Sequence, residues 1–170
     1  MTKVQVYVAT SLDGYIARKD GSIDWLPQPS DSSYGTFYTS VDTVIMGKTT
    51  YDQVLTFGDY PYKDKKSFVF TRTQNSNNDD KNVEFLSDVE KFVKDCFPGA
   101  GKNIWLVGGA KIIESFLNQG AIDEIILTII PIILGDGISL FQNSTNEKKL
   151  ELVKTEKYDQ IVDLHYKVTY

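Results

Sequence analysis

The fold is decided by residues 103–113, which run Asn103-Ile104-Trp105-Leu106-Val107-Gly108-Gly109-Ala110-Lys111-Ile112-Ile113. The continuous apolar run Ile104 to Val107 is typical of a strand that is covered on both faces. Gly108 and Gly109 remove two Cβ atoms at the carboxyl end of that strand, and the helix that follows directs unpaired N–H groups there. The stretch therefore predicts a phosphate-binding turn, although a glycine pair is also an ordinary tight connection between a strand and a helix.

The composition favours one globular domain that spans residues 1–170. Of the 170 residues 41% are hydrophobic and 24% are charged, and the net charge is −5, with no basic cluster to suit a nucleic-acid partner. The single cysteine, Cys96, cannot form an internal disulfide, which fits a cytoplasmic location. No signal peptide is visible, and the longest apolar run, Ile125 to Leu134, is too short to cross a membrane, so we expect no membrane partner.

Strand and helix patterns alternate along the chain. Strands are expected at 4–11, 43–46, 67–71, 82–86, 104–107 and 124–130, and helices at 33–39, 47–55, 87–97 and from 110 to a stop at Gly120. The tail alternates apolar and polar residues at 150–152 and 164–170, which predicts a two-stranded antiparallel ribbon. The pattern predicts an α/β fold with a mostly parallel central sheet, helices on both faces and a C-terminal antiparallel hairpin.

Two local signals predict how elements begin and turn. Ser87 and Glu90 have the spacing of a capping box at the start of the third helix. Asp20-Gly21, a common turn pair, predicts the tip of a small hairpin between Ile16 and Ile23.

Polar or glycine-rich turns follow three of the expected strands. They are Gly47-Lys48-Thr49-Thr50, Thr71-Arg72-Thr73 and Gly108-Gly109-Ala110. Ligands of open parallel sheets bind beyond the carboxyl ends of the strands, and these turns together suit an extended polyphosphate ligand such as a nucleotide. A Walker P-loop is excluded because Asp42 stands where that motif needs a glycine, and the GxGxxG fingerprint of a Rossmann domain is absent.

Four motifs in sequence order carry a resemblance to a known family. They are Ser11-Leu12-Asp13-Gly14-Tyr15-Ile16-Ala17 with Asp20-Gly21 and Asp24-Trp25, then Asp42 through Tyr51, then Val107-Gly108-Gly109, and last Ile130-Pro131 through Leu134-Gly135-Asp136-Gly137 to Leu140-Phe141. Over essentially its whole length the chain resembles the dihydrofolate reductase-like fold. It is most similar to the bacterial family of the riboflavin-biosynthesis reductase C-terminal domain.

The resemblance implies NADPH as the cofactor. In such enzymes the pyrophosphate lies on the paired-glycine turn, a basic residue at the position of Arg72 meets the 2′-phosphate, and the nicotinamide lies near Ala9, Thr10 and residues 14–16. The implied cofactor-binding residues are Ala9, Gly14, Ile16, Gly47, Lys48, Thr49, Thr50, Thr71, Arg72, Val107, Gly108, Gly109, Ala110, Lys111 and Ile112. A planar guanidinium suits a phosphate, although Arg72 is also explained as a solvated loop arginine.

The resemblance also implies a catalytic pair and a substrate pocket. Folate reductases carry a proton-donating acid shortly after a Trp-x-x-Pro-like segment, and Asp31 is the nearest carboxylate after Trp25-Leu26-Pro27. Its spacing departs from the folate pattern, and a helix N-cap explains Asp31 equally well. Thr128 matches a threonine that holds the acid and the substrate. Trp25, Tyr34 and Phe37 are expected to line an aromatic substrate pocket.

Metal chemistry is not expected. His165 is the single histidine, and its place in the tail ribbon favours a surface residue over a metal ligand.

These features favour an NADPH-dependent reductase that transfers a hydride to a small heterocyclic substrate, pterin-like or pyrimidine-like. The alternative is a nucleotide-binding or regulatory module that keeps the phosphate turns without the chemistry, whereas a purely structural oligomerisation domain explains neither glycine turn. A homodimer is also expected, from the apolar tail ending in Tyr166, Val168 and Tyr170, from the apolar strand around Pro131, and from the common pairing of such relatives.

Overall fold

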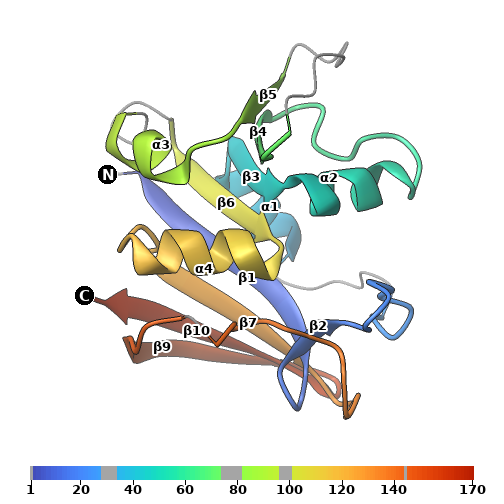
Figure 1. Ribbon diagram of the computed structural model, residues 1–170. Helices are drawn as coiled ribbons and strands as arrows, with labels where there is room; N and C mark the ends of the chain where they lie inside the picture. Colours follow the sequence, from blue (N-terminus) through green and yellow to red (C-terminus); the bar gives the residue numbers. More distant parts are fainter. Residues whose placement is uncertain (1, 28–33, 74–81, 96–100, 144) are drawn as a thin grey trace.

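The structure, a computed structural model, describes residues 2–27, 34–73, 82–95, 101–143 and 145–170. A single large sheet runs through the molecule with helices on both of its faces (Figure 1). Its strands in chain order are β1 (Lys3–Ser11), β3 (Thr43–Gly47), β4 (Lys66–Phe70), β5 (Val83–Leu86), β6 (Asn103–Gly108), β7 (Glu124–Ile130), β9 (Lys149–Tyr158) and β10 (Ile161–Thr169). The helices are α1 (Tyr34–Ser40), α2 (Lys48–Leu55), α3 (Val89–Asp95) and α4 (Ala110–Asn118).

The strand order is β5-β4-β3-β6-β1-β7-β10-β9. The six strands from β5 to β7 are parallel to one another, while β10 pairs antiparallel with β7 and β9 pairs antiparallel with β10. The predicted α/β fold with its C-terminal antiparallel hairpin is confirmed. Because β4, β3, β6, β1 and β7 are neighbours and parallel, their carboxyl ends form one continuous edge of the sheet.

Two apolar cores fill the space on the two faces of the sheet. Side chains of α3 and α4, including Phe92, Ile113 and Phe116, pack with the buried valines of β1 in the first core. The second core is aromatic, and in it Phe37 of α1 and Tyr51 of α2 pack against the opposite face of the sheet. Alternate residues of each strand therefore enter different cores, as the pleat of a strand requires.

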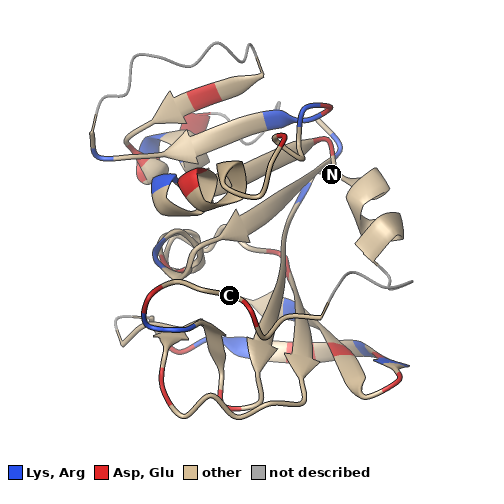
Figure 2. Ribbon diagram, turned by 90° about the vertical axis from the view of Figure 1, so that its right-hand side faces the viewer, with Lys and Arg blue, Asp and Glu red and all other residues tan. Residues whose placement is uncertain are grey.

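Charged residues are interspersed along the ribbon, with basic segments next to acidic ones (Figure 2). Several form ion pairs, such as Lys3 with Glu124 and Arg18 with Asp24. Among the described helices none is both long and apolar enough to cross a bilayer.

The small hairpin predicted around Asp20-Gly21 is wrong in one respect. Residues 20 and 21 do form a turn, in which the Arg18 N–H donates to the Ser22 carbonyl at 3.0 Å. However, β2 (Tyr15–Ala17) pairs antiparallel with β8 (Ile138–Ser139) and not with the residues that follow the turn. The partner strand comes from a distant part of the chain, which a local turn signal does not reveal.

The predicted capping box of α3 is also wrong. The Asp88 carboxylate, not Ser87, accepts from the N–H of Lys91 at 2.9 Å, and Glu90 pairs instead with Lys94 at 2.6 Å. The helix begins at Val89, one residue later than the capping box requires, so aspartate takes the N-cap position that it fills as well as serine. Cys96 lies outside the described residues.

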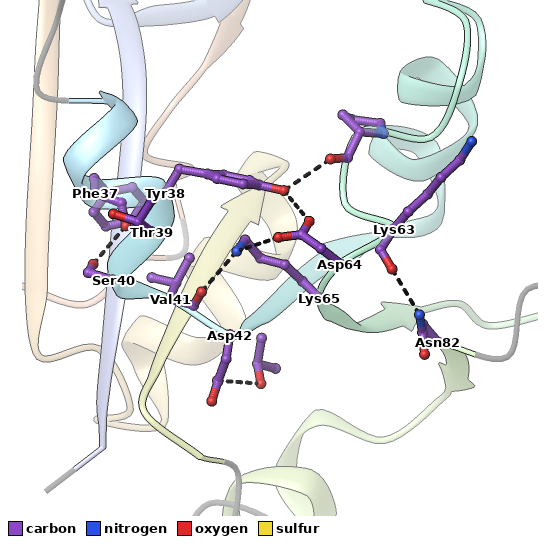
Figure 3. Close-up of polar contacts among 12 residues, drawn as sticks. Phe37, Tyr38, Thr39, Ser40, Val41, Asp42, Lys63, Asp64, Lys65 and Asn82 are labelled. Carbon is purple, nitrogen blue, oxygen red and sulfur yellow. Dashed lines mark hydrogen bonds and ion pairs between the residues drawn. The ribbon is translucent and has the colours of Figure 1, made fainter.

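A polar cluster fixes α1 to the start of β4 (Figure 3). The buried Lys65 ammonium donates to the Val41 carbonyl at 3.0 Å, pairs with Asp64 at 3.2 Å, and lies 3.9 Å from the centre of the Tyr38 ring. The Tyr38 hydroxyl donates to Asp64 at 2.6 Å, and this bond together with Lys65 holds the pKa of Asp64 below its usual value. Burial and the neighbouring Asp64 raise the pKa of Tyr38. The cluster sets the position from which α1 presents Tyr34 and Phe37 to the sheet.

Candidate functional site

The N-termini of α2 and α4 lie side by side at the carboxyl edge of the sheet. Their N-cap residues are Gly47 and Gly109, and neither helix has a side-chain hydrogen bond to its cap. A Cβ added to Gly47 would lie 3.1 Å from Cγ1 of Ile112, and one added to Gly109 would lie 3.4 Å from Oγ1 of Thr50. The added Cβ would be crowded at Gly47 and in ordinary van der Waals contact at Gly109, so the two first turns approach each other closely here. Two sets of unpaired N–H groups and two positive dipole ends thus converge on one place, which favours an anion.

Gly108 supplies the turn between β6 and α4. Its φ of +126° lies in the region that L side chains rarely adopt, and its peptide bond to Gly109 is cis. Val107 and Gly108 are the last residues of β6, while Ala110 and Lys111 begin α4. The phosphate-binding turn predicted from residues 103–113 therefore has the expected strand–glycine–helix geometry.

The three polar turns lie at adjacent strand ends. Gly47 is the register partner of Phe70, and Met46 that of Gly108, so β3 stands between the turn after β4 and the turn after β6. The next strand along the edge is β1, which ends at Ser11. An extended ligand on this edge would cross the end of β4, the paired helix N-termini and then the end of β1.

The basic groups of this edge differ in their availability. Lys48 pairs with Asp52 one turn along its own helix, at 2.5 Å. Arg72 is exposed in a turn closed by the Thr71 hydroxyl, which donates to the Thr73 carbonyl at 3.0 Å, and Arg72 forms no ion pair with a described residue. Lys111 is exposed at the second position of α4. Arg72 is thus the cation best placed to meet a ligand at the end of β4.

The loop after β1 is held to residues 131–140. The Asp13 carboxylate accepts from the Ser11 hydroxyl at 2.6 Å and from the N–H groups of Leu134 and Gly135 at 3.1 and 2.8 Å. These bonds, the Ser11 bond first, lower the pKa of Asp13. Further along, the N–H of Leu140 donates to the Gly14 carbonyl at 3.0 Å. Two of the motifs that carried the resemblance therefore form one structural unit, in which Gly14 and Ile16 flank the end of β1.

Tyr34 and Phe37 come together with Tyr7 of β1 and Trp105 of β6. The Phe37 ring lies 4.8 Å from Tyr7 and 5.5 Å from Trp105 in edge-to-face contacts, and Tyr34 is 6.1 Å from Tyr7. Phe37 is buried, whereas Tyr34 is partly exposed. Trp25 lies in the loop after β2 and makes no ring contact with a described residue, so the structure brings together two of the three expected pocket residues.

Thr128 lies on the same sheet face, at the point where β7 pairs with both β1 and β10. It is the register partner of Ala9 on one side and of Asp163 on the other. The Thr128 hydroxyl donates to Oδ1 of Asp163 at 2.6 Å, and the Tyr7 hydroxyl donates to Oδ2 at 3.2 Å. Asp163 is only 1% exposed, and it is a residue of the site that the sequence motifs did not identify. Its burial follows from the pairing of β10 with β7, which no local pattern of the tail signals.

Two further residues considered from the sequence are Asp31 and His165. Asp31, the expected proton donor, lies outside the described residues. His165 is partly buried and not fully at the surface as expected, and its Nε2 lies 3.3 Å from Glu156. Within the described ranges no three His, Cys, Asp or Glu side chains are grouped to hold a metal ion.

A family model decides the relationship. The model of the RibD C-terminal domain matches residues 61–164, from the loop before β4 to the middle of β10. The chain belongs to this family. The match contains the glycine pair, Thr128 and Asp163, whereas β1, α1 and α2 lie before the matched residues.

Individual relatives agree with the family assignment. The chain is 44% identical to the protein YwjB of Bacillus subtilis (strain 168) over 169 residues, covering 96% of this chain and 97% of that protein. It is 33% identical to YyaP of the same organism, covering 94% of this chain and 91% of that one. The crystal structure of a putative riboflavin biosynthesis protein from Shewanella sp. PV-4 is 30% identical, with a TM-score of 0.88, and the alignment covers 99% of this chain and 100% of that one.

A more distant structure shows the fold of the family in a longer protein. It is the diaminohydroxyphosphoribosylaminopyrimidine deaminase/5-amino-6-(5-phosphoribosylamino)uracil reductase of Thermotoga maritima, with a TM-score of 0.72 and 18% identity. The alignment covers 99% of this chain but 57% of that one. The RibD C-terminal domain of the present chain therefore has the dihydrofolate reductase-like architecture of the family.

Proposed function

We propose that the chain is an NADPH-dependent oxidoreductase that transfers a hydride to a small heterocyclic substrate, pterin-like or pyrimidine-like. One observation carries the proposal: the uncapped N-termini of α2 and α4 meet beside Gly47 and Gly109 at the carboxyl edge of the sheet. This arrangement fits a pyrophosphate, because backbone N–H groups and helix dipoles both favour negative charge there. Family membership supports a reductase, since the fold is that of the RibD reductase domain.

Different residues along the carboxyl edge of the sheet would bind different parts of the cofactor. Gly108, Gly109 and the first turns of α2 and α4 would hold the pyrophosphate, and Arg72 would meet the 2′-phosphate at the end of β4. NADPH, when bound, supplies the hydride, while the protein supplies orientation and the exclusion of water. Ala9, near the end of β1, is partly exposed and is the register partner of Thr128. The substrate would lie there, against Tyr34 of α1.

Binding and turnover test the proposal separately. A ligand present at one hundred times its dissociation constant stabilises a fold by about 2.7 kcal/mol, so NADPH is expected to raise the melting temperature. Oxidation of NADPH is then followed at 340 nm with pterin, pyrimidine and imine substrates. Binding without oxidation by any of them would favour the nucleotide-binding module, and the absence of a thermal shift would contradict both functions.

We expect Arg72→Ala to weaken NADPH binding about tenfold or more and to leave NADH binding nearly unchanged. A charge-assisted pair between Arg72 and the 2′-phosphate would contribute roughly 1.5–3 kcal/mol to the binding of NADPH. NADH has no 2′-phosphate, so the substitution removes no such pair from its complex. Calorimetric titration with both cofactors measures the difference. Lys66→Ala is a matched control, because Lys66 is an exposed cation of β4 that faces Glu84 and lies at the other end of the strand. Equal losses for the two cofactors would remove Arg72 from this role.

We also propose that the protein forms a homodimer through β9. This strand ends the sheet and carries Leu150, Leu152 and Val153 with 42%, 53% and 64% of their surfaces exposed. Of the tail residues from which the sequence predicted a dimer, Val168 is buried in the core and Tyr166 is partly buried, whereas Tyr170 is 58% exposed. The exposed aliphatic side chains of the hairpin lie on β9. An unpaired apolar edge suits a symmetric partner.

Light scattering at micromolar concentration should give twice the 19.2 kDa mass of the chain. Val153→Lys is expected to shift the particle to the monomer, because a buried lysine would face its own copy across a symmetric interface. Phe57→Lys, which charges an equally exposed apolar residue elsewhere, serves as the control. If light scattering gives the mass of a monomer for the unmodified protein, the homodimer proposal is wrong.

A further inference from the structure

The two cores of the protein differ in the chemistry of their aromatic rings. Among the described residues, the buried rings of the first core are all phenylalanines, namely Phe68, Phe70, Phe92 and Phe116. The second core, on the face that α1 and α2 cover, instead contains the buried rings of Tyr51, Tyr60, Tyr62, Phe37 and Trp105, with Tyr34 and Tyr38 packed against them. A buried hydroxyl costs free energy unless it is bonded, so burial alone favours phenylalanine in both cores. The tyrosines of the second core therefore suggest a chemical role.

The rings of the second core form a continuous chain of contacts. The Trp105 ring lies 5.8 Å from Tyr34 and 5.4 Å from Tyr62. Both of these rings lead to Tyr38, which lies 5.9 Å from Tyr34 and 6.4 Å from Tyr62. Indole and phenol rings lose an electron much more readily than a benzene ring does, and electrons pass quickly between rings in contact. Two routes of electron transfer thus join the buried Trp105 to the partly exposed Tyr38.

The hydrogen bonds at the two ends of the chain of rings set the direction of transfer. The Trp105 N–H donates to the Tyr7 carbonyl at 3.2 Å, and a backbone carbonyl is too weak a base to take the proton. The Tyr38 hydroxyl donates to the Asp64 carboxylate at 2.6 Å, closer than the Pro61 carbonyl at 3.0 Å (Figure 3). Oxidised Tyr38 can therefore pass its proton to a base and become a neutral radical, whereas oxidised Trp105 keeps a positive charge in the core.

The surroundings of Tyr38 favour this loss of the proton. The Lys65 ammonium lies 3.9 Å from the centre of the Tyr38 ring and disfavours a positive charge on it. The Asp64 side chain is 63% exposed, so a proton that it receives exchanges with water. Tyr7 also has a carboxylate partner, Asp163 at 3.2 Å, but that carboxyl group is 1% exposed, and its proton would stay inside the protein. Tyr38 is thus the better end point for an oxidising equivalent.

We propose that the second core is a relay that carries an oxidising equivalent from Trp105 through Tyr34 and Tyr62 to Tyr38, where a thiol in solution removes it. The oxidant is an oxygen-centred radical, which takes one electron from Trp105 and one proton from water. Trp105 regains an electron from Tyr34 or Tyr62, and that ring regains one from Tyr38. The phenol proton of Tyr38 passes to Asp64 and from there to water. The Tyr38 radical then takes a hydrogen atom from the thiol, which becomes a thiyl radical. The relay spares the indole from irreversible oxidation, and it does not require the proposed reductase activity.

Flash photolysis of the full chain tests the relay without any cofactor. Trp25→Phe leaves Trp105 as the single tryptophan, and a laser pulse ejects one electron from it. Transient absorption should show the Trp105 radical converting to a tyrosyl radical at a first-order rate that does not depend on protein concentration. The product should give the EPR spectrum of a neutral tyrosyl radical. A rate that rises with protein concentration, or a Trp105 radical that does not convert, would contradict the relay.

Further variants in this background identify the end of the relay. Tyr38→Phe keeps the ring but removes the phenol and its bond to a carboxylate, so the conversion should slow about tenfold or more. Asp64→Asn leaves an acceptor oxygen for Tyr38 but removes the base, so it should slow the conversion to a similar extent even if Tyr38→Phe does not fold. Tyr166→Phe is the control, because it removes a partly buried phenol that packs against the first core. Its conversion rate should be unchanged.

Two further results would overturn the relay. If Tyr7→Phe slows the conversion while Tyr38→Phe and Asp64→Asn do not, the oxidising equivalent ends beside Asp163 and not at the surface. Dithiothreitol should shorten the lifetime of the tyrosyl radical, because Tyr38 is partly exposed, and an unchanged lifetime would exclude an exit at Tyr38. None of these measurements involves NADPH, so the relay can stand if the reductase proposal fails, and the reductase proposal can stand if the relay fails.

Discussion

We expect Asp31→Asn to lower turnover about 10²–10⁴-fold, which is the usual effect of losing a general acid. The affinity for NADPH should stay unchanged. Hydride transfer to a carbon–nitrogen double bond leaves a charge on nitrogen that a proton must neutralise. Asp31 stands three residues before the first residue of α1, the helix that presents Tyr34 to the sheet. A carboxyl group next to aromatic side chains has its pKa raised by desolvation, which would let it donate a proton near neutral pH.

The measurement is a comparison of steady-state rates with calorimetric cofactor affinities for the unmodified protein and two variants. Asp24→Asn is the matched control, because Asp24 is an exposed carboxylate of the preceding loop whose partner is Arg18. Its effect on turnover should be within about twofold, as for a surface ion pair. If Asp31→Asn turns over as fast as Asp24→Asn, then Asp31 is only a helix cap and water protonates the substrate directly.

The parallel part of the fold could be predicted from local patterns because each signal lies within the element that it describes. The apolar run Ile104 to Val107 does become the buried strand β6, and Gly120 does end α4 with a positive φ of +69°. The glycine pair likewise lies between a strand and a helix, as the sequence predicted. Periodicity and turn chemistry suffice for elements of this kind.

Features that depend on distant parts of the chain could not be predicted in this way. The pairing of β2 with β8 joins residues more than one hundred positions apart, and no local pattern encodes it. Asp163 is a similar case, because no motif of the sequence marks it as a functional residue. Its burial follows from the register of β10 against β7, which sets it opposite Thr128 and within reach of Tyr7.

The same limit applies to the basic groups of the cofactor edge. In the sequence Lys48 and Arg72 each follow a strand, and the resemblance assigns the 2′-phosphate to Arg72. In the structure Lys48 is turned along its own helix to Asp52, as an i,i+4 pair, while Arg72 is not paired with a described residue. The proposed anion site would therefore depend on backbone N–H groups at the two helix N-termini more than on side-chain charge.

Because the proposed site would depend on backbone groups, we expect Gly109→Val to weaken NADPH binding about 100-fold or more. A side chain at Gly109 would enter the space beside the Thr50 hydroxyl, where a Cβ alone already lies 3.4 Å away. The backbone of Gly109, with a φ of −76° and a ψ of −164°, is extended and accepts valine. The fold should therefore persist while the branched side chain screens the N–H groups of both first turns. Two lost charge-assisted hydrogen bonds would account for the expected loss.

Calorimetry with NADPH measures this loss, and circular dichroism confirms that the variant is folded. Gly35→Val makes the same substitution in α1, where a Cβ meets no atom within 4 Å, and it should bind NADPH as the unmodified protein does. The two variants together distinguish a blocked phosphate turn from a general cost of replacing glycine. If Gly109→Val folds and binds NADPH with undiminished affinity, the pyrophosphate does not lie between α2 and α4, and the assignment of the cofactor to this edge of the sheet must be withdrawn.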